Sequence, residues 1–191
     1  MMAECPCNLS AATSRAAIRN EVASIQPFDG MEETHLADAL AWIDSGAPLC
    51  RTAKPATPPK HLVAYFAVVD GGNMLLVDHK GAQLWLPPGG HVEPGEHPRE
   101  TVRRELFEEL KVVSSHEITE PLMVTCTTTV GLTAGHVDVS LWYVVRVDLN
   151  QSIRFDEEEF AGVQWFKFAD VPLNRSDPHL ERFLMKLTSV L

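Results

Sequence analysis

The segment from Leu84 to Val112 constrains the fold of this chain most strongly, because it places a turn and a helix in immediate succession. The run Pro87-Pro88-Gly89-Gly90 is rich in turn-forming residues, and its glycines let the backbone approach a ligand closely. Further on, apolar residues recur every fourth position at Val102, Leu106 and Leu110. This spacing predicts an amphipathic helix with one buried stripe, so its polar side is held in a fixed orientation.

Three carboxylates, those of Glu105, Glu108 and Glu109, share one face of the predicted helix. Like charges at this spacing are unfavourable unless a cation lies between them, and hard divalent cations such as Mg²⁺ or Mn²⁺ prefer oxygen ligands. Arg104 lies four residues from both Glu100 and Glu108, within reach to orient and partly neutralise the group. A metal-phosphate site and a solvated acidic surface are both compatible with this pattern, and the glycine turn and apolar stripe favour the first.

The segment resembles the Nudix box of the Nudix hydrolases, Gly-x5-Glu-x7-Arg-Glu-U-x-Glu-Glu-x-Gly-U, in which U is a bulky aliphatic residue. The positions that fall in register are Gly90, Glu96, Arg104, Glu105, Leu106, Glu108, Glu109 and Val112. One position departs, because Lys111 stands where the family usually has glycine. Since such a glycine ends a helix in a left-handed cap, the departure puts the end of the helix in question more than the chemistry.

The resemblance implies a hydrolase acting on phosphoric anhydrides. It implies that Glu105, Glu108 and Glu109 bind Mg²⁺ or Mn²⁺, with the Gly90 carbonyl as a further candidate ligand. In the same comparison, Arg104 and Glu96 would form a supporting ion pair that holds the ligand geometry without contacting the substrate. It also implies a Nudix fold of the α+β class, with a mixed β-sheet between α-helices, over roughly residues 60–191.

Two glutamates are candidates for the general base, because family members differ in which residue they use. Some use a carboxylate of the box, here Glu105, and others use a glutamate from a later loop. In this chain Glu159 precedes Trp165 by six residues, a spacing similar to that of an extra metal-binding glutamate in some relatives. We predict that Glu159 is the extra ligand or base, in preference to Glu157 and Glu158. The alternative is that this acidic run is a solvated loop.

Aromatic and histidine side chains near the box allow two interpretations each. An aromatic face can stack a base, but aromatic residues of strands are more often part of the core. Histidines in the box loop are either phosphate contacts or merely exposed. The segment from His136 to Trp142 alternates polar with apolar residues, which is typical of a half-buried strand with one face on a pocket or on solvent. The residues concerned are Tyr65, Phe66, Trp85, Trp142, His91, His97, His136, Asp138 and Ser140.

Composition and net charge limit the kinds of molecule that the protein is expected to bind. The chain has 191 residues, of which 45% are hydrophobic and 22% charged, as in a soluble globular protein. No apolar run approaches the length of about 18 residues needed to span a membrane, and the N-terminus lacks the pattern of a secretory signal. We therefore expect a cytoplasmic protein without a membrane partner. A formal net charge of −10 disfavours binding to a nucleic-acid polymer, whereas a small nucleotide can bind through a metal ion.

Residues 1–59 are predicted to form an N-terminal tail, a helical arm and a proline-rich connector. The tail covers residues 1–10, and helical patterns follow from about Ala11 to Ile25 and from about Glu32 to Ile43, with Asp29 as the cap of the second helix. Prolines between residues 46 and 60 indicate an extended connector. We expect the arm to be a packing or dimerisation element, so that a homodimer is one expectation.

After residue 60 the pattern changes to short strands around the box helix. Strands are predicted at residues 61–69, 73–78, 84–86, 121–130, 136–147 and 164–168, and a closing helix at 177–191. Strands interrupted by one helix and followed by another are typical of an α+β arrangement, in agreement with the resemblance.

The leading hypothesis for function is a metal-dependent pyrophosphohydrolase that cleaves a nucleoside diphosphate linked to another group. Nucleoside triphosphates, including oxidised ones, are one such substrate class. The alternative is a non-catalytic Nudix-fold module that senses a nucleotide or sugar nucleotide. Retention of Arg104, Glu105, Glu108 and Glu109 counts against this alternative, since such regulators commonly lose box carboxylates. Isomerisation of an isoprenoid diphosphate is a third option, for which Cys126 alone is a weak argument.

Overall fold

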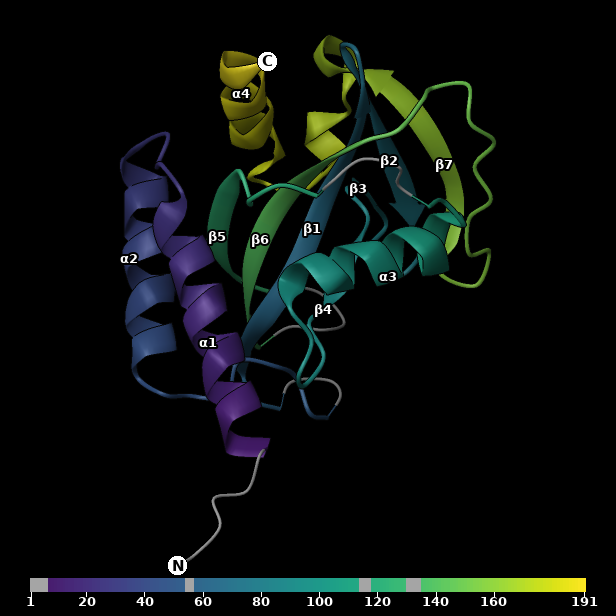
Figure 1. Ribbon diagram of the computed structural model, residues 1–191. Helices are drawn as coiled ribbons and strands as arrows, with labels where there is room; N and C mark the ends of the chain where they lie inside the picture. Colours follow the sequence, from purple (N-terminus) through teal and green to yellow (C-terminus); the bar gives the residue numbers. More distant parts are fainter. Residues whose placement is uncertain (1–6, 54–56, 114–117, 130–134) are drawn as a thin grey trace, which may run out of the picture.

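The computed structural model describes residues 7–53, 57–113, 118–129 and 135–191 (Figure 1). Seven strands in this part of the chain form one sheet, with β4 paired to β1 and β7 paired to β2 beside the path β3-β2-β1-β6-β5. The β1–β6 pair is parallel and the other pairs are antiparallel, so the sheet is mixed, as predicted. The strands are β1 Lys60–Asp70, β2 Asn73–His79, β3 Leu84–Leu86, β4 Gly89–His91, β5 Met123–Thr128, β6 Val137–Arg146 and β7 Phe160–Lys167.

Helices cover both faces of the sheet. One buried cluster joins the sheet to α1, α2 and α3, and a second cluster joins its other face to α4. The bounds are α1 Cys7–Ser24, α2 Gly30–Asp44, α3 Pro98–Leu110 and α4 Leu180–Val190, with short 3-10 helices η2 Phe168–Asp170 and η3 Leu173–Arg175. Figure 1 shows α1 and α2 side by side at one edge of the sheet and α3 across its front. The predicted α+β fold, with a mixed sheet between helices, is confirmed.

Strand β1 lies at the centre and shows why the sheet is covered on both faces. Its side chains alternate, with Leu62 and Phe66 in the first cluster and Ala67 and Val69 in the second. A strand buried on both faces reads as a continuous apolar run rather than as an alternating pattern. That is the pattern of residues 61–69, and the strand predicted there is confirmed.

Two boundaries differ clearly from the predictions. Helix α1 begins at Cys7, so the predicted tail is wrong for residues 7–10, and residues 1–6 lie outside the described part. Strand β7 begins at Phe160 rather than at Gln164, because it pairs along the whole of β2. The predicted cap of α2 is confirmed, since the side chain of Asp29 accepts a hydrogen bond of 2.9 Å from the Glu32 N–H.

The N-terminal arm packs into the same core as the sheet. Val22 and Ile43 are buried in the first cluster together with residues of β1 and β6. A buried ion pair of 2.7 Å between Glu32 and Lys186 connects α2 to α4. The arm is thus a packing element, while a domain boundary at residue 59 and a homodimer stay predictions. Within the described residues, no helix is both long and apolar enough to cross a membrane.

Helix α3 is bounded by specific caps. His97 accepts a hydrogen bond from the Arg99 N–H, and Pro98 occupies the first turn, where its missing N–H is tolerated. At the other end Lys111 adopts a left-handed conformation, with φ 54° and ψ 31°, and its N–H donates to Phe107 O. The helix therefore ends in the same conformation that the usual glycine provides, but with a residue for which this conformation is strained.

Replacing Lys111 with glycine should stabilise the protein by about 1 kcal/mol, because glycine adopts the left-handed conformation without strain. The hydrolytic rate should not change. Thermal or denaturant unfolding of K111G measures the gain, and K111A is the matched control, since it loses the amine but keeps the strain. A gain of the same size in K111A, or a rate change without a stability change in K111G, would contradict this account of the cap.

Candidate active site

Helix α3 presents the three box carboxylates in different degrees of burial. The apolar stripe of Val102, Leu106 and Leu110 is buried against the sheet, as predicted. Because Glu109 lies next to this stripe, it is also buried, at 5% exposure, whereas the Glu108 side chain is 57% exposed. Glu105 lies between these extremes, with a side-chain exposure of 13%. The acidic face is therefore not uniformly solvated, since one edge of it is enclosed.

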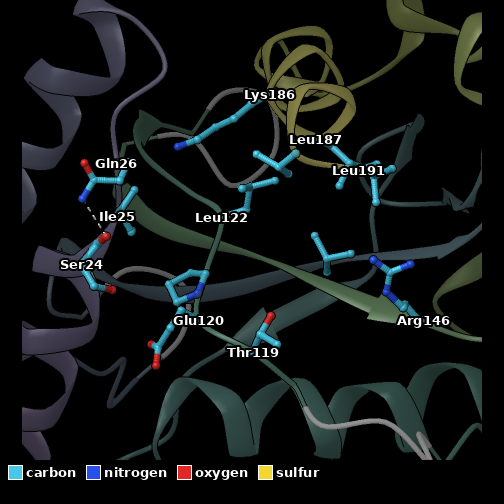
Figure 2. Close-up of a pocket in the computed structure, with 13 residues that line it drawn as sticks. Ser24, Ile25, Gln26, Thr119, Glu120, Leu122, Arg146, Lys186, Leu187 and Leu191 are labelled. Carbon is cyan, nitrogen blue, oxygen red and sulfur yellow. Dashed lines mark hydrogen bonds between the residues drawn. The ribbon is translucent and has the colours of Figure 1, made fainter.

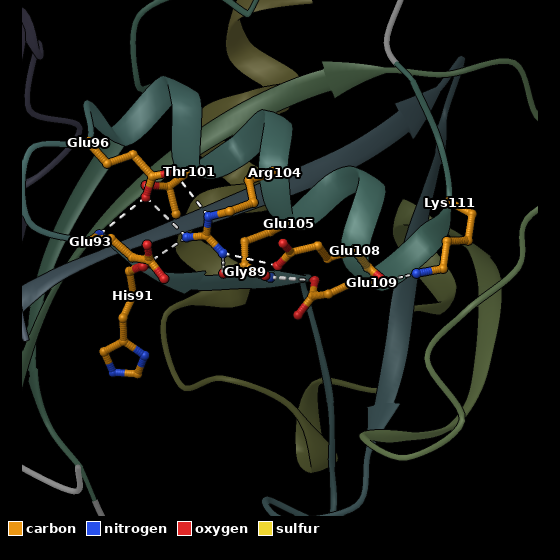
Figure 3. Close-up of polar contacts among 10 residues, drawn as sticks. All are labelled: Gly89, His91, Glu93, Glu96, Thr101, Arg104, Glu105, Glu108, Glu109 and Lys111. Carbon is orange, nitrogen blue, oxygen red and sulfur yellow. Dashed lines mark hydrogen bonds and ion pairs between the residues drawn. The ribbon is translucent and has the colours of Figure 1, made fainter. Parts of the chain in front are cut away.

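The glycine turn contacts this enclosed edge. A Cβ at Gly90 would lie 1.9 Å from Glu105 Oε1, and one at Gly89 would lie 2.4 Å from the Ala64 carbonyl oxygen. A side chain at Gly89 would clash with backbone, and one at Gly90 would displace the Glu105 carboxylate. The Gly89 N–H donates a hydrogen bond of 3.1 Å to Glu109 Oε2, which brings β4 and α3 together (Figure 3). The backbone of the turn and the carboxylates of the helix thus line one site.

Arg104 connects the acidic residues of the helix and the loop. Its guanidinium donates two hydrogen bonds to Glu96, of 3.0 and 3.1 Å, and one of 2.7 Å to Glu105. It also contacts Glu108 at 3.2 Å and donates to the His91 carbonyl at 3.2 Å (Figure 3). The ion pair of Arg104 with Glu96 that the resemblance implied is present, whereas Glu100 pairs with the neighbouring Arg103 instead. A planar, multidentate donor of this kind orients several carboxylates at once.

The charges in the site are unevenly compensated. Burial alone would raise the pKa of Glu96, but hydrogen bonds from Arg104 and Thr101 hold that pKa below its usual value. Burial raises the pKa of Glu105, and the contact with Arg104 offsets this effect only in part. Burial and the charges of Glu105 and Glu159 raise the pKa of Glu109 well above its usual value. The pair Glu105–Glu109 therefore has an excess of negative charge that a bound cation would neutralise.

The loop that carries Glu159 is attached to the end of α3. Backbone hydrogen bonds run from the Arg154 N–H to Leu110 O, at 3.2 Å, and from the Asp156 N–H to Glu109 O, at 2.9 Å. The charge of Glu159 acts on both Glu105 and Glu109, and its carboxylate lies 3.4 Å from His79 Nε2. The structure thus attaches the segment that carries Glu159 to the helix that carries the box carboxylates.

Of the aromatic candidates, only two are accessible. Phe66 and Trp142 are fully buried in the core, whereas Tyr65 and Trp85 are partly exposed at the edge of the second cluster. Burial and the nearby charges of Asp177, Asp138 and Glu109 raise the pKa of Tyr65. Tyr65 packs against the second cluster, on the sheet face opposite α3, and is paired in register with Gly89 of β4.

One group of polar residues was not predicted as a unit. His61, His91, His136 and Asp138 converge on that same sheet face. The polar–apolar alternation of residues 136–142 indicated that His136 and Asp138 share one face of a strand. His61 stands in an apolar run, and nothing in the sequence pattern marked it as part of a site. His97, by contrast, caps α3 and contacts Glu21 at 3.2 Å, so it faces the arm.

An apolar cavity of about 550 Å³ lies away from the box (Figure 2). It is bounded by the end of α1, residues 119–122, β6 and α4, and no box residue lines it. The chemistry of the box therefore does not use this cavity.

Comparisons with known proteins identify the family. The model of the NUDIX domain matches residues 59–187 of the chain. Similar solved structures include a MutT NUDIX hydrolase from Burkholderia pseudomallei, with 24% identity and a TM-score of 0.57 over 66% of this chain and 97% of that one. The NUDIX domain of Shewanella oneidensis NrtR complexed with ADP ribose has 20% identity and a TM-score of 0.54 over 67% and 86% of the two chains. An Ap4A hydrolase from C. elegans has 20% identity and a TM-score of 0.52 over 69% and 94%. Among curated proteins, none matches the chain.

The chain belongs to the Nudix family, since the family model covers most of it and these structures share its fold. It is a hydrolase of the class that acts on phosphoric anhydrides. The helical arm up to residue 58 precedes the matched region.

Replacing Arg104 with lysine should lower the hydrolytic rate by about 10- to 100-fold, the range expected when a residue that orients the ligands is changed. Lysine keeps the charge but cannot contact Glu96 with two hydrogen bonds and Glu105 at the same time. Steady-state kinetics measure the effect.

The matched control is R103K, because Arg103 is the next residue of the helix and makes an exposed ion pair with Glu100. Its rate should equal that of the wild type. Equal rates for R104K and the wild type would show that Arg104 is not needed to orient the site.

Proposed function

We propose that this protein is a divalent-metal-dependent pyrophosphohydrolase that cleaves a nucleoside diphosphate linked to another group. The observation that carries the proposal is the enclosed pair of carboxylates, Glu105 and Glu109, against the Gly89-Gly90 backbone. The match to the NUDIX domain model supports the reaction class. The particular substrate and the metal are our proposal.

The residues present fit a hard divalent cation. The carboxylates of Glu105, Glu108 and Glu109 and the Gly90 carbonyl are all oxygen donors, the type that Mg²⁺ and Mn²⁺ prefer. Within the described residues, a single arginine, Arg104, contacts the box carboxylates, so negative charge remains in excess. A cation bound there would neutralise the phosphoryl oxygens and bring an attacking water close to the phosphorus.

The side chains of this chain would hold the reacting groups in place. Arg104 keeps Glu105 oriented, and the Gly89 N–H fixes one oxygen of Glu109, which leaves the remaining oxygens of both carboxylates available as ligands or as a proton acceptor. Glu159 comes from a different segment, and its charge acts on the same pair. We infer that Glu159 is the additional ligand or general base, and Glu105 is the second candidate for the base.

The surroundings of the box support this substrate class. Tyr65 and Trp85 are partly exposed aromatic side chains that offer faces for a nucleobase. One structural neighbour is a NUDIX domain complexed with ADP ribose, and another is an Ap4A hydrolase, both of which concern nucleotides with a diphosphate or longer phosphate chain. The net charge of −10 favours a small nucleotide over a nucleic-acid polymer.

Incubation with Mg²⁺ or Mn²⁺ and a panel of nucleotides tests the proposal. The panel should include nucleoside triphosphates, oxidised nucleotides, dinucleoside polyphosphates and nucleotide sugars, with released phosphate, pyrophosphate and monophosphate as readouts. We expect cleavage of a diphosphate linkage that depends on the metal. Tight binding of one nucleotide without turnover of any would contradict catalysis and favour a sensing module.

Replacing Glu109 with glutamine should lower the rate by more than about 100-fold, beyond the range for a residue that only orients ligands. The same change should stabilise the metal-free protein at neutral pH, because it removes a buried charge. The pKa of Glu109 is raised on folding, so the folded state holds a proton that the unfolded state loses. Stability of the metal-free wild type therefore falls as the pH rises through this range.

Thermal unfolding of metal-free E109Q and wild type at several pH values measures the second effect. The difference in melting temperature should vanish below the usual pKa of a glutamate, about 4.3. E100Q is the matched control, since Glu100 lies on the same helix and is exposed. Full activity in E109Q would show that this carboxylate is not a ligand.

Replacing Glu159 with glutamine should lower the rate by about 100-fold or more, the range of contribution of a general base. E157Q and E158Q are matched controls from the same exposed turn, and their rates should equal that of the wild type. Equal activity of all three variants would assign the base to Glu105 instead.

A further inference from the structure

A second group of potential ligands lies on the opposite face of the sheet from α3. It consists of His61 on β1, His91 on β4, His136 just before β6 and Asp138 on β6, and one ligand atom of each lies within 4.8 Å of all the others. The strand register explains the convergence, because His61 pairs with Asp138 and His91 pairs with Val63, two residues along β1 from His61. We call this set the histidine–aspartate cluster.

The cluster is enclosed by protein. His61 is fully buried and His136 is 4% exposed, although both are polar. Asp138 Oδ1 lies 3.2 Å from His61 Nε2 and 3.3 Å from His136 Nε2. Within the described residues, neither His61 Nε2 nor Asp138 Oδ1 has an aligned hydrogen bond. Buried polar atoms of this kind ordinarily have a partner, so the cluster calls for one.

A hydrogen bond on the outer side of the His61 ring fixes its tautomer. His61 Nδ1 lies 2.8 Å from the Pro58 carbonyl, which can only accept, so this nitrogen carries the proton. His136 Nδ1 lies 3.1 Å from Thr129 Oγ1, and the Thr129 hydroxyl can accept the Nδ1 proton while it donates its own to the His136 carbonyl at 3.2 Å. With both ring protons on Nδ1, each ring directs a lone pair from Nε2 towards the same carboxylate oxygen. Three acceptors facing each other repel unless a cation lies between them, and a histidine whose other nitrogen donates to a carbonyl is the usual form of a metal ligand.

The spacing and chemistry match a borderline transition metal. Ligands bound at about 2.0–2.1 Å to a tetrahedral ion lie about 3.4 Å from one another. The two distances from Asp138 Oδ1, 3.2 and 3.3 Å, are close to this value, and all four ligand atoms lie within 4.8 Å of one another. Imidazole nitrogens favour zinc and its neighbours, whereas the oxygen donors of the box favour Mg²⁺ or Mn²⁺. We propose that the histidine–aspartate cluster binds a divalent transition-metal ion of the zinc type, at a site separate from the box.

The position of His91 gives this site a structural role beside the box. Its carbonyl accepts a hydrogen bond from Arg104 Nη2, at 3.2 Å, while its ring points away from α3 (Figure 3). The ring is grouped with the other members of the cluster. The residue follows directly on Gly89 and Gly90, which contact the box glutamates. An ion in the cluster would therefore fix β4 to the starts of β1 and β6, and we expect it to stabilise the folded protein by binding.

Elemental analysis of untagged protein, purified without chelator and supplied with Zn²⁺, tests the proposal. We expect about one zinc ion per chain in the wild type, the stoichiometry of a single four-ligand site. D138N and H136Q should lose this ion. D138N keeps the shape of the side chain, and circular dichroism of both variants checks that they are folded. H35Q is the matched control, because His35 is a partly buried histidine outside the cluster, and it should retain the ion.

Two further measurements separate the cluster from the box and from other occupants. E109Q should retain the zinc ion, and Co²⁺ reconstitution should give the visible absorption of a four-coordinate site in the wild type and not in D138N. A chelator should lower the melting temperature of the zinc-loaded wild type but not that of D138N. Wild-type protein without zinc or cobalt uptake, or zinc lost in E109Q and kept in D138N, would overturn the proposal. So would binding of inorganic phosphate at the cluster in place of the metal.

Discussion

The approach of the Gly89-Gly90 backbone to the carboxylates of α3 is the contact on which the active site depends. Gly90 lies so close to Glu105 that a Cβ would overlap its carboxylate, and the Gly89 N–H binds Glu109 directly. This contact encloses two negative charges that a solvated helix face would leave in water. Enclosure makes the charges costly in the absence of a cation, and the same cost favours binding of one.

Arg104 limits that cost without removing it. Its guanidinium neutralises Glu96 and contacts Glu105, but Glu109 and the nearby Glu159 remain in excess. A further arginine at this place would compete with a metal ion, and one fewer would leave the carboxylates without orientation. The loop that carries Glu159 is attached by its backbone to the end of α3, so the second acidic segment is placed by the same helix.

The sequence predicted the features that depend on local patterns. The stripe of Val102, Leu106 and Leu110, the cap at Asp29 and the central strand all follow from spacing and residue type. Features set by tertiary contacts were predicted poorly. The start of β7 depends on its pairing with β2, and Lys111 is held in a left-handed conformation that its residue type disfavours. The histidine–aspartate cluster combines residues from three strands, which no local pattern connects. His61 stands in an apolar run, so in the sequence it looks like any other position of a buried strand.

Diffraction from crystals grown with Mn²⁺ and a non-hydrolysable nucleotide, recorded at a wavelength where manganese scatters anomalously, tests the central claim most directly. The account predicts an anomalous peak between the Gly90 carbonyl and the carboxylates of Glu105 and Glu109, with the phosphate chain of the nucleotide in contact with it. A bound nucleotide with no manganese peak at these oxygens, and with the carboxylates directed into solvent, would contradict it.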